Sequence, residues 1–162
     1  MIYSRSSEYA IRALVHLAQV PDGKYVMVKN IAEQEDIPAY YLAKTLQQLT
    51  RKGLLRSCKG AKGGFALGVD PNKIRLLDIV ELLDGLAPYQ QCANGLSECN
   101  DDVLCSMHDS WVALRSSIVD YLERNTISDL AKALGQKNKA IAMTKQRKSR
   151  RSVAAKRSPI GL

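Results

Sequence analysis

Three cysteines and a histidine lie close together in the second half of the chain. Cys92, Cys99 and Cys105 are followed by His108 in the spacing C-x6-C-x5-C-x2-H, within a Gly-, Asn- and Gln-containing stretch that has no apolar period. Thiolates and an imidazole are the ligands that iron–sulfur clusters and zinc take from proteins. A shared metal centre would also explain how a loop of roughly twenty residues stays ordered in a small domain. The pattern therefore indicates a metal site.

Zinc and an iron–sulfur cluster both use this donor set. Structural zinc sites take their ligands in pairs about two to four residues apart, and only Cys105 and His108 are that close here. The wider spacings suit the larger perimeter of a cluster better. Ordinary free thiols are the remaining interpretation, and it is the one expected for the isolated Cys58.

Motifs for enzymatic chemistry are missing from the sequence. The stretch from Gly60 to Gly64 is followed by Phe65 rather than by Lys-Ser/Thr, and no helix opens after it, so it does not match a phosphate-binding loop. The sequence has no nucleophile elbow, no H-E-x-x-H motif and no recognisable Ser, His and Asp set. We therefore expect a protein that is not an enzyme.

The elements that must position the metal site are mostly helical. Two short helices joined through Asp36-Ile37-Pro38 predict a helix-turn-helix, and two strands flanking the glycine stretch predict a wing directly after it. The fold class is therefore mainly α with a small β-wing. Apolar periodicity and capping residues predict helices at 5–20, 28–35, 39–52, 73–83, 107–123 and 126–134, and strands at 54–58 and 65–69.

Charge separates the body of the chain from its end. The net charge is +8, yet all 16 acidic residues lie at or before Asp129, and nine of the 24 basic residues lie in 136–162. That segment lacks the period of a packed helix and is predicted to be a disordered basic tail. No apolar run reaches transmembrane length and no signal peptide is visible, so no membrane association and a cytoplasmic location are expected.

Positive charge also gathers on the predicted recognition helix and wing. No acidic residue occurs between Asp36 and Asp70, and this segment contains Lys44, Arg51, Lys52, Arg56, Lys59 and Lys62. A cluster of cations without counter-charges on these two elements is expected where a protein contacts a phosphate backbone. A solvated surface with no partner is the alternative.

Several sequence segments accompany the triple-Cys loop: Ser4 to Leu14, Ile31-Ala32-Glu33, Tyr41-Leu42, Leu49-Thr50-Arg51-Lys52-Gly53-Leu54 and Gly60-Ala61-Lys62-Gly63-Gly64-Phe65-Ala66-Leu67-Gly68. Together they resemble the IscR/NsrR-type winged-helix transcription regulators, many of which bind an iron–sulfur cluster. The resemblance covers roughly residues 1–135 and implies a homodimer joined through the helix at 107–123, bound to a palindromic DNA operator.

The resemblance leaves two candidates for the fourth cluster ligand. His108 stands where members with a 2Fe–2S cluster have a ligating histidine, and Glu8 stands where members with a 4Fe–4S cluster use a carboxylate from the other protomer. His108 is favoured, because it is near Cys105 in sequence and needs no partner chain, and a 2Fe–2S cluster is favoured with it. Glu8 has an independent explanation as an acidic residue in a first helical turn.

The resemblance also implies which residues contact DNA. The start of the recognition helix would face the major groove, and Lys59 on the wing would reach the backbone or minor groove. Tyr40 and Lys44 are the expected readers of base edges. The full predicted DNA-binding set is Ala39, Tyr40, Tyr41, Lys44, Arg51, Lys59 and Lys62.

The functional expectation is a DNA-binding transcription regulator, a repressor in particular, whose operator affinity depends on a cluster that senses redox, iron or nitric oxide status. The first alternative is a regulator without a cluster that senses through thiols, zinc or a small ligand; the second is a small electron-transfer protein. We expect a winged helix-turn-helix DNA-binding domain at 1–72, a cluster-binding loop with dimerisation helices at 73–135, and the basic tail at 136–162.

Overall fold

The computed structural model describes residues 2–60, 63–96, 99 and 105–155, and only the backbone of residues 145–155. It is mostly helical with one small antiparallel sheet, so the predicted fold class is confirmed. The elements are α1 (Arg5–Ala18), α2 (Val28–Glu35), α3 (Ala39–Arg51), β1 (Leu55–Cys58), β2 (Gly64–Leu67), the 3-10 turn η1 (Pro71–Lys73), α4 (Leu76–Leu83), the 3-10 turn η2 (Ala87–Tyr89), α5 (His108–Arg124) and α6 (Ile127–Ala155).

The first three helices form the predicted helix-turn-helix and its support. Ser4 caps α1 by accepting hydrogen bonds from the backbone N–H groups two and three residues further on. Asp36 ends α2 in the left-handed conformation, which turns the chain sharply into α3. The apolar side of α3, formed by Leu42, Leu46 and Leu49, is fully buried. The opposite side of α3 is thereby left to solvent.

The wing is a two-stranded hairpin that pairs with a third segment of chain. β1 and β2 run antiparallel from Leu55 opposite Leu67 to Cys58 opposite Gly64. Val26 and Phe65 exchange two backbone hydrogen bonds of 2.9 and 2.8 Å, which attach the hairpin to the segment before α2. Gly64 has a φ of +143°, and a Cβ there would overlap the backbone carbonyl of Val26. Only glycine allows this approach.

A second backbone pairing joins the winged helix to the C-terminal helices. The amide of Leu76 donates to Asn125 O at 3.0 Å, and the amide of Ile127 donates to Ile74 O at 2.9 Å. This extended pairing explains why α4 begins at Leu76 and not at 73, where the sequence predicted its start. One hydrophobic cluster extends from Ala10 to Ile127, so the core crosses the predicted domain boundary at 72.

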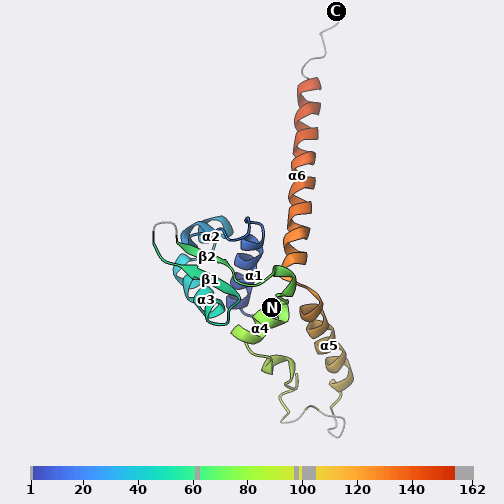
Figure 1. The fold of residues 1–162 in the computed structure, drawn as a ribbon. Coiled ribbons are helices and arrows are strands. Elements are labelled where there is room, and N and C mark those ends of the chain that lie inside the picture. Colours follow the sequence, from blue (N-terminus) through green and yellow to red (C-terminus); the bar gives the residue numbers. More distant parts are fainter. Residues whose placement is uncertain (1, 61–62, 97–98, 100–104, 156–162) are drawn as a thin grey trace, which may run out of the picture.

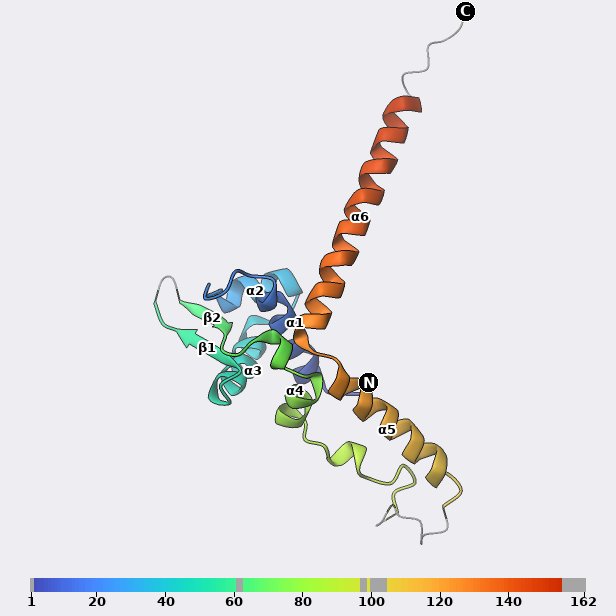
Figure 2. The same ribbon diagram turned by 45° about the vertical axis from the view of Figure 1, so that its right-hand side comes forward.

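α5 and α6 point in different directions from this core, as Figures 1 and 2 both show. Thr126 and Asp129 form a capping box at the start of α6, with backbone bonds of 3.1 and 3.2 Å. The helix predicted to end near Leu134 continues to Ala155, so residues 136–155 of the predicted disordered tail are helical. Ala, Lys, Gln and Arg have high intrinsic helix propensity and need no apolar face. None of the described helices has the length and apolarity to cross a bilayer.

Candidate metal centre and nucleic-acid interface

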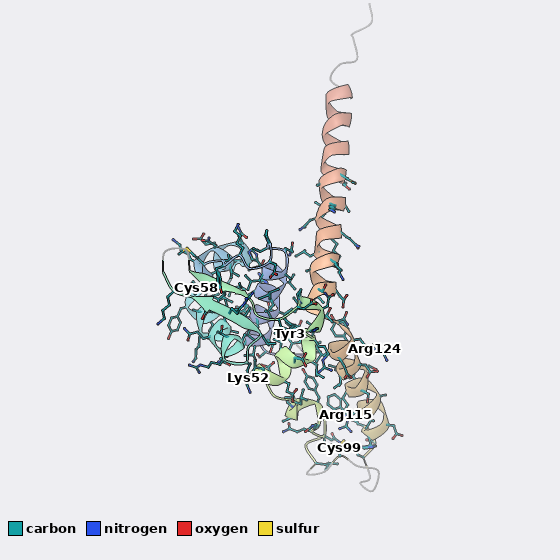
Figure 3. The ribbon with its side chains drawn as sticks, viewed as in Figure 1. Tyr3, Lys52, Cys58, Cys99, Arg115 and Arg124 are labelled. Carbon is teal, nitrogen blue, oxygen red and sulfur yellow. The ribbon has the colours of Figure 1, made fainter. Side chains whose placement is uncertain are left out.

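α5 holds the start of the cysteine loop. The indole Nε1 of Trp111 donates to Gln91 O at 2.8 Å, and the guanidinium of Arg115 donates to Gln90 O at 3.2 Å. These two bonds fix the backbone immediately before Cys92. Figure 3 shows Arg115 and Cys99 at the same end of the molecule, below the rest of the helices.

Pairwise contacts link the three loop cysteines and His108 in this place. Cys92 contacts the thiols of Cys105 and Cys99, and the Sγ of Cys99 lies 3.6 Å from Nδ1 of His108. Backbone N–H groups of Asn94 and Leu96 hold the pKa of the Cys92 thiol below its ordinary value, and the thiols of Cys105 and Cys99 lower this pKa further. A lowered pKa favours the thiolate, which is the form that binds metals and reacts with oxidants.

An open cavity lies against two of these thiols. It has a volume of about 580 Å³ and is lined by Cys92, Cys99 and residues of the 87–96 segment. Three soft sulfur donors, one imidazole and adjacent space fit the chemistry of an iron–sulfur cluster. Among the described residues, no three or more Cys, His, Asp or Glu side chains are arranged to hold a metal ion.

The structure places two further members of the predicted donor set. Cys105 lies just before α5, which begins at His108. The carboxylate of Glu8, the alternative fourth ligand, pairs with Arg12 at 3.5 Å one turn along α1. Cys58 is exposed on the wing, well away from Cys99 in Figure 3, as expected for a thiol outside the site.

The cysteine loop is also tied to the N-terminus of α1. Asp84, at the end of α4, accepts hydrogen bonds from the backbone N–H of Ser4 at 2.8 Å and from the hydroxyl of Ser7 at 2.9 Å. The hydroxyl of Tyr89 in η2 donates to the carbonyl of Ile2. Burial, followed by the nearby Asp84 charge, raises the pKa of Tyr89, which keeps this hydroxyl protonated as a donor. The segment leading into the loop is therefore anchored on α1 by side chains.

The same turn of α1 contacts the recognition helix. The hydroxyls of Ser6 and Tyr41 are 2.9 Å apart, and the rings of Tyr9 and Tyr41 meet edge to face with centroids 5.7 Å apart. Through Ser4 and Ser7, α1 thus contacts the segment that leads into the cysteine loop. Through Ser6, it contacts the start of α3. No local sequence pattern predicts these contacts, because Ser6 and Tyr41 lie 35 residues apart in the chain.

Some of the predicted DNA-contacting side chains are free in solvent, whereas Tyr41 also contacts α1. Tyr40 is 87% exposed, whereas Tyr41 is 43% exposed and is held by α1. The exposed cations on α3 and the wing are Lys44, Arg51, Lys52, Arg56 and Lys59. Within the described part of the chain, none of them pairs with a carboxylate. Ala39 is also exposed, and Lys62 lies outside the described residues. The arrangement presents a cationic surface around a projecting tyrosine.

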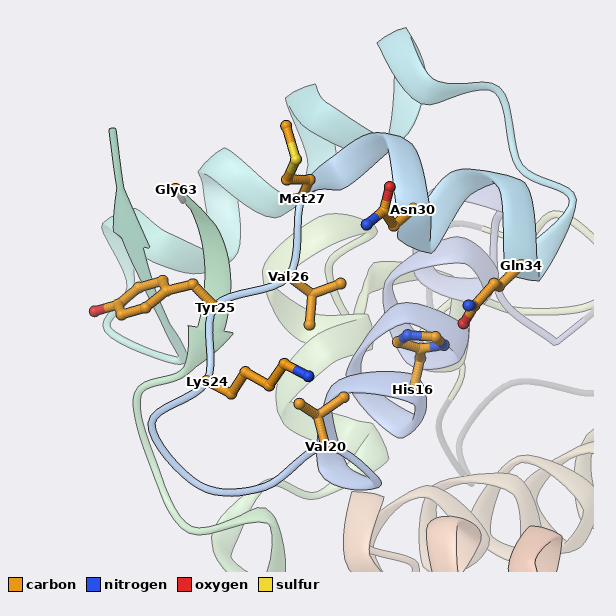
Figure 4. Close-up of a pocket in the computed structure, with 9 residues that line it drawn as sticks. All are labelled: His16, Val20, Lys24, Tyr25, Val26, Met27, Asn30, Gln34 and Gly63. Atoms are coloured by element: carbon orange, nitrogen blue, oxygen red, sulfur yellow. The ribbon is translucent and has the colours of Figure 1, made fainter. Parts of the chain in front are cut away.

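A separate hollow of about 620 Å³ lies on another side of the winged helix. Figure 4 shows its walls, formed by the end of α1, the exposed side of α2 and the Val26 segment that pairs with the wing. His16 and Lys24 line it, but no cysteine does. The hollow is therefore distinct from the cavity beside Cys92 and Cys99.

A family model named Rrf2 and described as an iron-dependent transcriptional regulator matches residues 3–133. The chain belongs to the Rrf2 family. Rrf2 proteins are DNA-binding transcription regulators, so this chain is a regulator and not an enzyme. The predicted resemblance to the IscR type is confirmed at the level of this family.

Relatives of the chain fall into more than one branch of the Rrf2 family. A protein of Aquifex aeolicus (strain VF5), named among the HTH-type transcriptional regulators, is 38% identical over 132 residues, 80% of this chain and 91% of the relative. The structure of CymR, the global cysteine regulator of B. subtilis, matches with a TM-score of 0.68 and 27% identity, covering 80% of this chain and 95% of CymR. That of T. potens IscR matches with a TM-score of 0.65 and 27% identity, covering 81% and 86%.

Proposed function

We propose that this Rrf2 protein is a repressor that binds a palindromic operator as a homodimer and whose DNA affinity is set by an iron–sulfur cluster. Cys92, Cys99, Cys105 and His108 would hold the cluster, with 2Fe–2S favoured over 4Fe–4S and with Glu8 as the alternative fourth ligand. The carrying observation is the gathering of three thiols and an imidazole beside a cavity. When bound, the cluster supplies a centre that oxidants, iron limitation or nitric oxide can alter.

The DNA-binding side of the proposal rests on residues 1–72. Tyr40 and Lys44 project from the start of α3 and are proposed to read base edges in the major groove. Arg51, Lys59 and Lys62 are proposed to contact phosphates, with Ala39 and Tyr41 beside the groove. Lysine on the wing gives a point charge and not the planar fork of arginine, which suits backbone contacts.

Coupling between the two sites is proposed to pass through α1. A change at Cys92 alters the segment that begins at Asp84, and Asp84 holds Ser4 and Ser7 at the start of α1. Ser6 in the same turn holds Tyr41 of the recognition helix. Loss of the cluster would therefore move the start of α3, where base contacts are made. Such coupling requires different contacts in the two states of the loop.

Anaerobic purification tests the cluster directly. We expect coloured protein that contains iron and acid-labile sulfide. Operator affinity is expected to differ between cluster-loaded and cluster-free protein. The variants Cys92→Ser, Cys99→Ser and Cys105→Ser are expected to lose their iron. Cys58→Ser is the matched control and is expected to keep its iron, because Cys58 lies on the wing. Colourless protein with stoichiometric zinc would contradict the proposal. The DNA for these assays is selected from a random-sequence pool with the wild-type protein.

The coupling route has its own test. Asp84→Ala removes the acceptor of Ser4 and Ser7 without touching a proposed cluster ligand. We expect this variant to bind iron and DNA, with the ratio of DNA affinities between cluster-loaded and cluster-free protein reduced at least tenfold. An unchanged ratio would mean that α1 does not carry the signal.

Thiol sensing without a cluster is a second candidate. The lowered pKa of Cys92 and its contacts with the thiols of Cys99 and Cys105 favour it, because a thiolate beside a second thiol is set up to form a disulfide on oxidation. The similarity to CymR, a cysteine regulator, points the same way. This candidate predicts iron-free protein whose DNA affinity changes with peroxide and recovers with dithiothreitol.

A further inference from the structure

The C-terminal part of α6 extends beyond the family's common fold. The Rrf2 model matches residues 3–133, whereas α6 continues to Ala155. We call residues 136–155 the basic arm. Every residue from 136 to 144 is exposed, and Figures 1 and 2 both show this part of α6 leaving the body as a straight rod. The arm is not needed to complete the core described above.

The basic arm carries positive charge alone. No acidic residue follows Asp129, and nine cations follow Gln136, seven of them within the arm. Residues 1–135 hold 15 basic and 16 acidic residues, so the excess positive charge of the chain lies in this segment. A concentration of positive charge without acidic residues favours a polyanionic partner.

The few apolar residues of the arm do not form a packing stripe. Ile141 is 54% exposed and Met143 is 66% exposed, and residues two apart point to opposite sides of a helix. Between them and the body lie Lys137, Asn138 and Lys139. A second helix or a bilayer would need a continuous apolar face. The composition favours an electrostatic partner.

We infer that the basic arm binds the phosphate backbone of duplex DNA without sequence preference and thereby strengthens the DNA binding of the winged helix. The arm's 20 residues span about 30 Å as a helix, comparable to about nine base pairs of duplex. Duplex DNA is a polyanion that an Rrf2 regulator already approaches. The inference rests on the family's DNA binding and is independent of the proposed cluster.

Salt dependence of binding to a random-sequence duplex tests the inference. Binding is measured with a 40-base-pair duplex of random sequence for the full chain, for a chain ending at Gly135, and for a full-length variant with seven substitutions. That variant replaces Lys137, Lys139, Lys145, Arg147, Lys148, Arg150 and Arg151 with Gln, which is also a good helix former. If about half of the arm's seven cations contact phosphates, the slope of log affinity against log salt is steeper by about three for each intact arm.

The outcomes separate charge from other roles of the arm. The inference is supported if the glutamine variant loses most of the slope that truncation removes, with affinity at low salt reduced at least tenfold in both. Truncation also removes Lys156 and Arg157, which the glutamine variant keeps. A matched variant with Lys137, Lys139, Lys145 and Lys148 changed to Arg keeps the charge and is expected to keep the slope. Unchanged slopes would overturn the inference. A loss of slope on truncation but not in the glutamine variant would also overturn it. So would a glutamine variant whose binding to phosphatidylserine vesicles is weakened more than its binding to DNA.

Failure of this test and failure of the proposed function are distinguishable. The random-sequence duplex requires no operator, and the comparison is made with protein stripped of metal by chelation. A regulator with an iron–sulfur cluster but no phosphate-binding arm would therefore fail here and still pass the iron and sulfide analysis.

Discussion

Tyr40 and Tyr41 are neighbours in the chain, but their side chains have different surroundings. Tyr41 is held against α1 by Ser6 and Tyr9, whereas Tyr40 is 87% exposed and makes no such contact. A side chain this exposed contributes little to folding, and its position at the start of α3 among unpaired cations favours a role in contacting a partner. A proposed DNA contact and a packing contact thus lie on adjacent residues.

Tyr40→Ala is expected to weaken operator binding about tenfold, about 1.4 kcal/mol, while the free energy of unfolding changes by less than about 0.5 kcal/mol. Fluorescence anisotropy with operator DNA and denaturant unfolding measure the two effects. Tyr41→Phe is the paired variant, in which the bond to Ser6 is lost and the ring contact with Tyr9 is kept. A Tyr40→Ala protein with wild-type affinity would remove this residue from the DNA interface.

Gly64→Ala is expected to destabilise the wing. The added Cβ would overlap the backbone carbonyl of Val26, and the φ of +143° is strained for alanine, so we expect a cost of about 1–3 kcal/mol. Gly60→Ala is the matched control, because its φ is also positive at +104° but nothing lies within 4 Å of its Cβ. Thermal unfolding of both variants makes the comparison; equal losses would show that the contact with Val26 is unimportant.

Among the elements, those that bury one face were predictable from the sequence. α1, α3 and α5 begin within a residue or so of their predicted starts, because Leu14, Leu42 and Leu122 follow the helical period of the core. The extension of α6 past Gly135 was not predicted, because an exposed helix depends on propensity and has no apolar period. The start of α4 was misplaced because the pairing of Arg75 with Thr126 joins segments distant in sequence.

The junction between α4 and α5 depends on one ion-pair network. Arg75 contacts Asp78 at 2.7 Å and Glu123 at 3.2 Å, and its backbone N–H donates to Asp78 at 3.0 Å. Burial raises the pKa of Asp78, but hydrogen bonds from the side chain and backbone of Arg75 outweigh it and leave the pKa below its ordinary value. Asp78 therefore stabilises the fold in its ionised form.

Asp78→Asn is expected to destabilise the protein by about 1 kcal/mol at neutral pH, a modest value because both partners are partly exposed. A carboxyl whose pKa is lowered on folding contributes stability above its unfolded pKa of about 4, and this stability is lost as the pH falls through the folded pKa. The difference in free energy of unfolding between wild type and variant should thus be constant above about pH 5 and shrink below about pH 4.

Denaturant unfolding across this pH range measures the effect. Asp120→Asn is the control, because its pair with Arg124 is highly exposed and lies outside the junction. A difference between Asp78→Asn and wild type that stays constant down to pH 2 would contradict the assigned role of the ionised carboxylate.

At the scale of the whole molecule, the donor residues of the site were predictable but their connections were not. Soft ligands clustered in a loop without period can be recognised from residue types alone. The bonds of Asp84 to Ser4 and of Tyr89 to Ile2 join residues about eighty positions apart, and no local pattern encodes such contacts. The contacts proposed to couple the two sites are therefore visible only in the three-dimensional structure.

The proposed homodimer has a candidate surface on α5. Leu114 is 54% exposed and Tyr121 is 49% exposed, and a spacing of seven residues places them on one side of the helix. We expect Leu114→Glu to convert the dimer to a monomer while the helical content is retained. Sedimentation velocity and circular dichroism measure the two properties.

Ser116→Glu is the control for that experiment. Position 116 is exposed and lies about 200° around the helix from Leu114, so a carboxylate there leaves the proposed interface untouched. A Leu114→Glu protein that sediments as wild type does would place the interface on another surface.

The pairing of Val26 with Phe65 also affects the order in which the protein folds. These partners are separated by roughly forty residues, so the hairpin reaches its full set of bonds only after α2 and α3 have brought the chain back. The amides of Val26 and Phe65 should therefore gain protection from hydrogen exchange together and after those of α3. The surface proposed to contact DNA would then be among the last parts of the chain to fold.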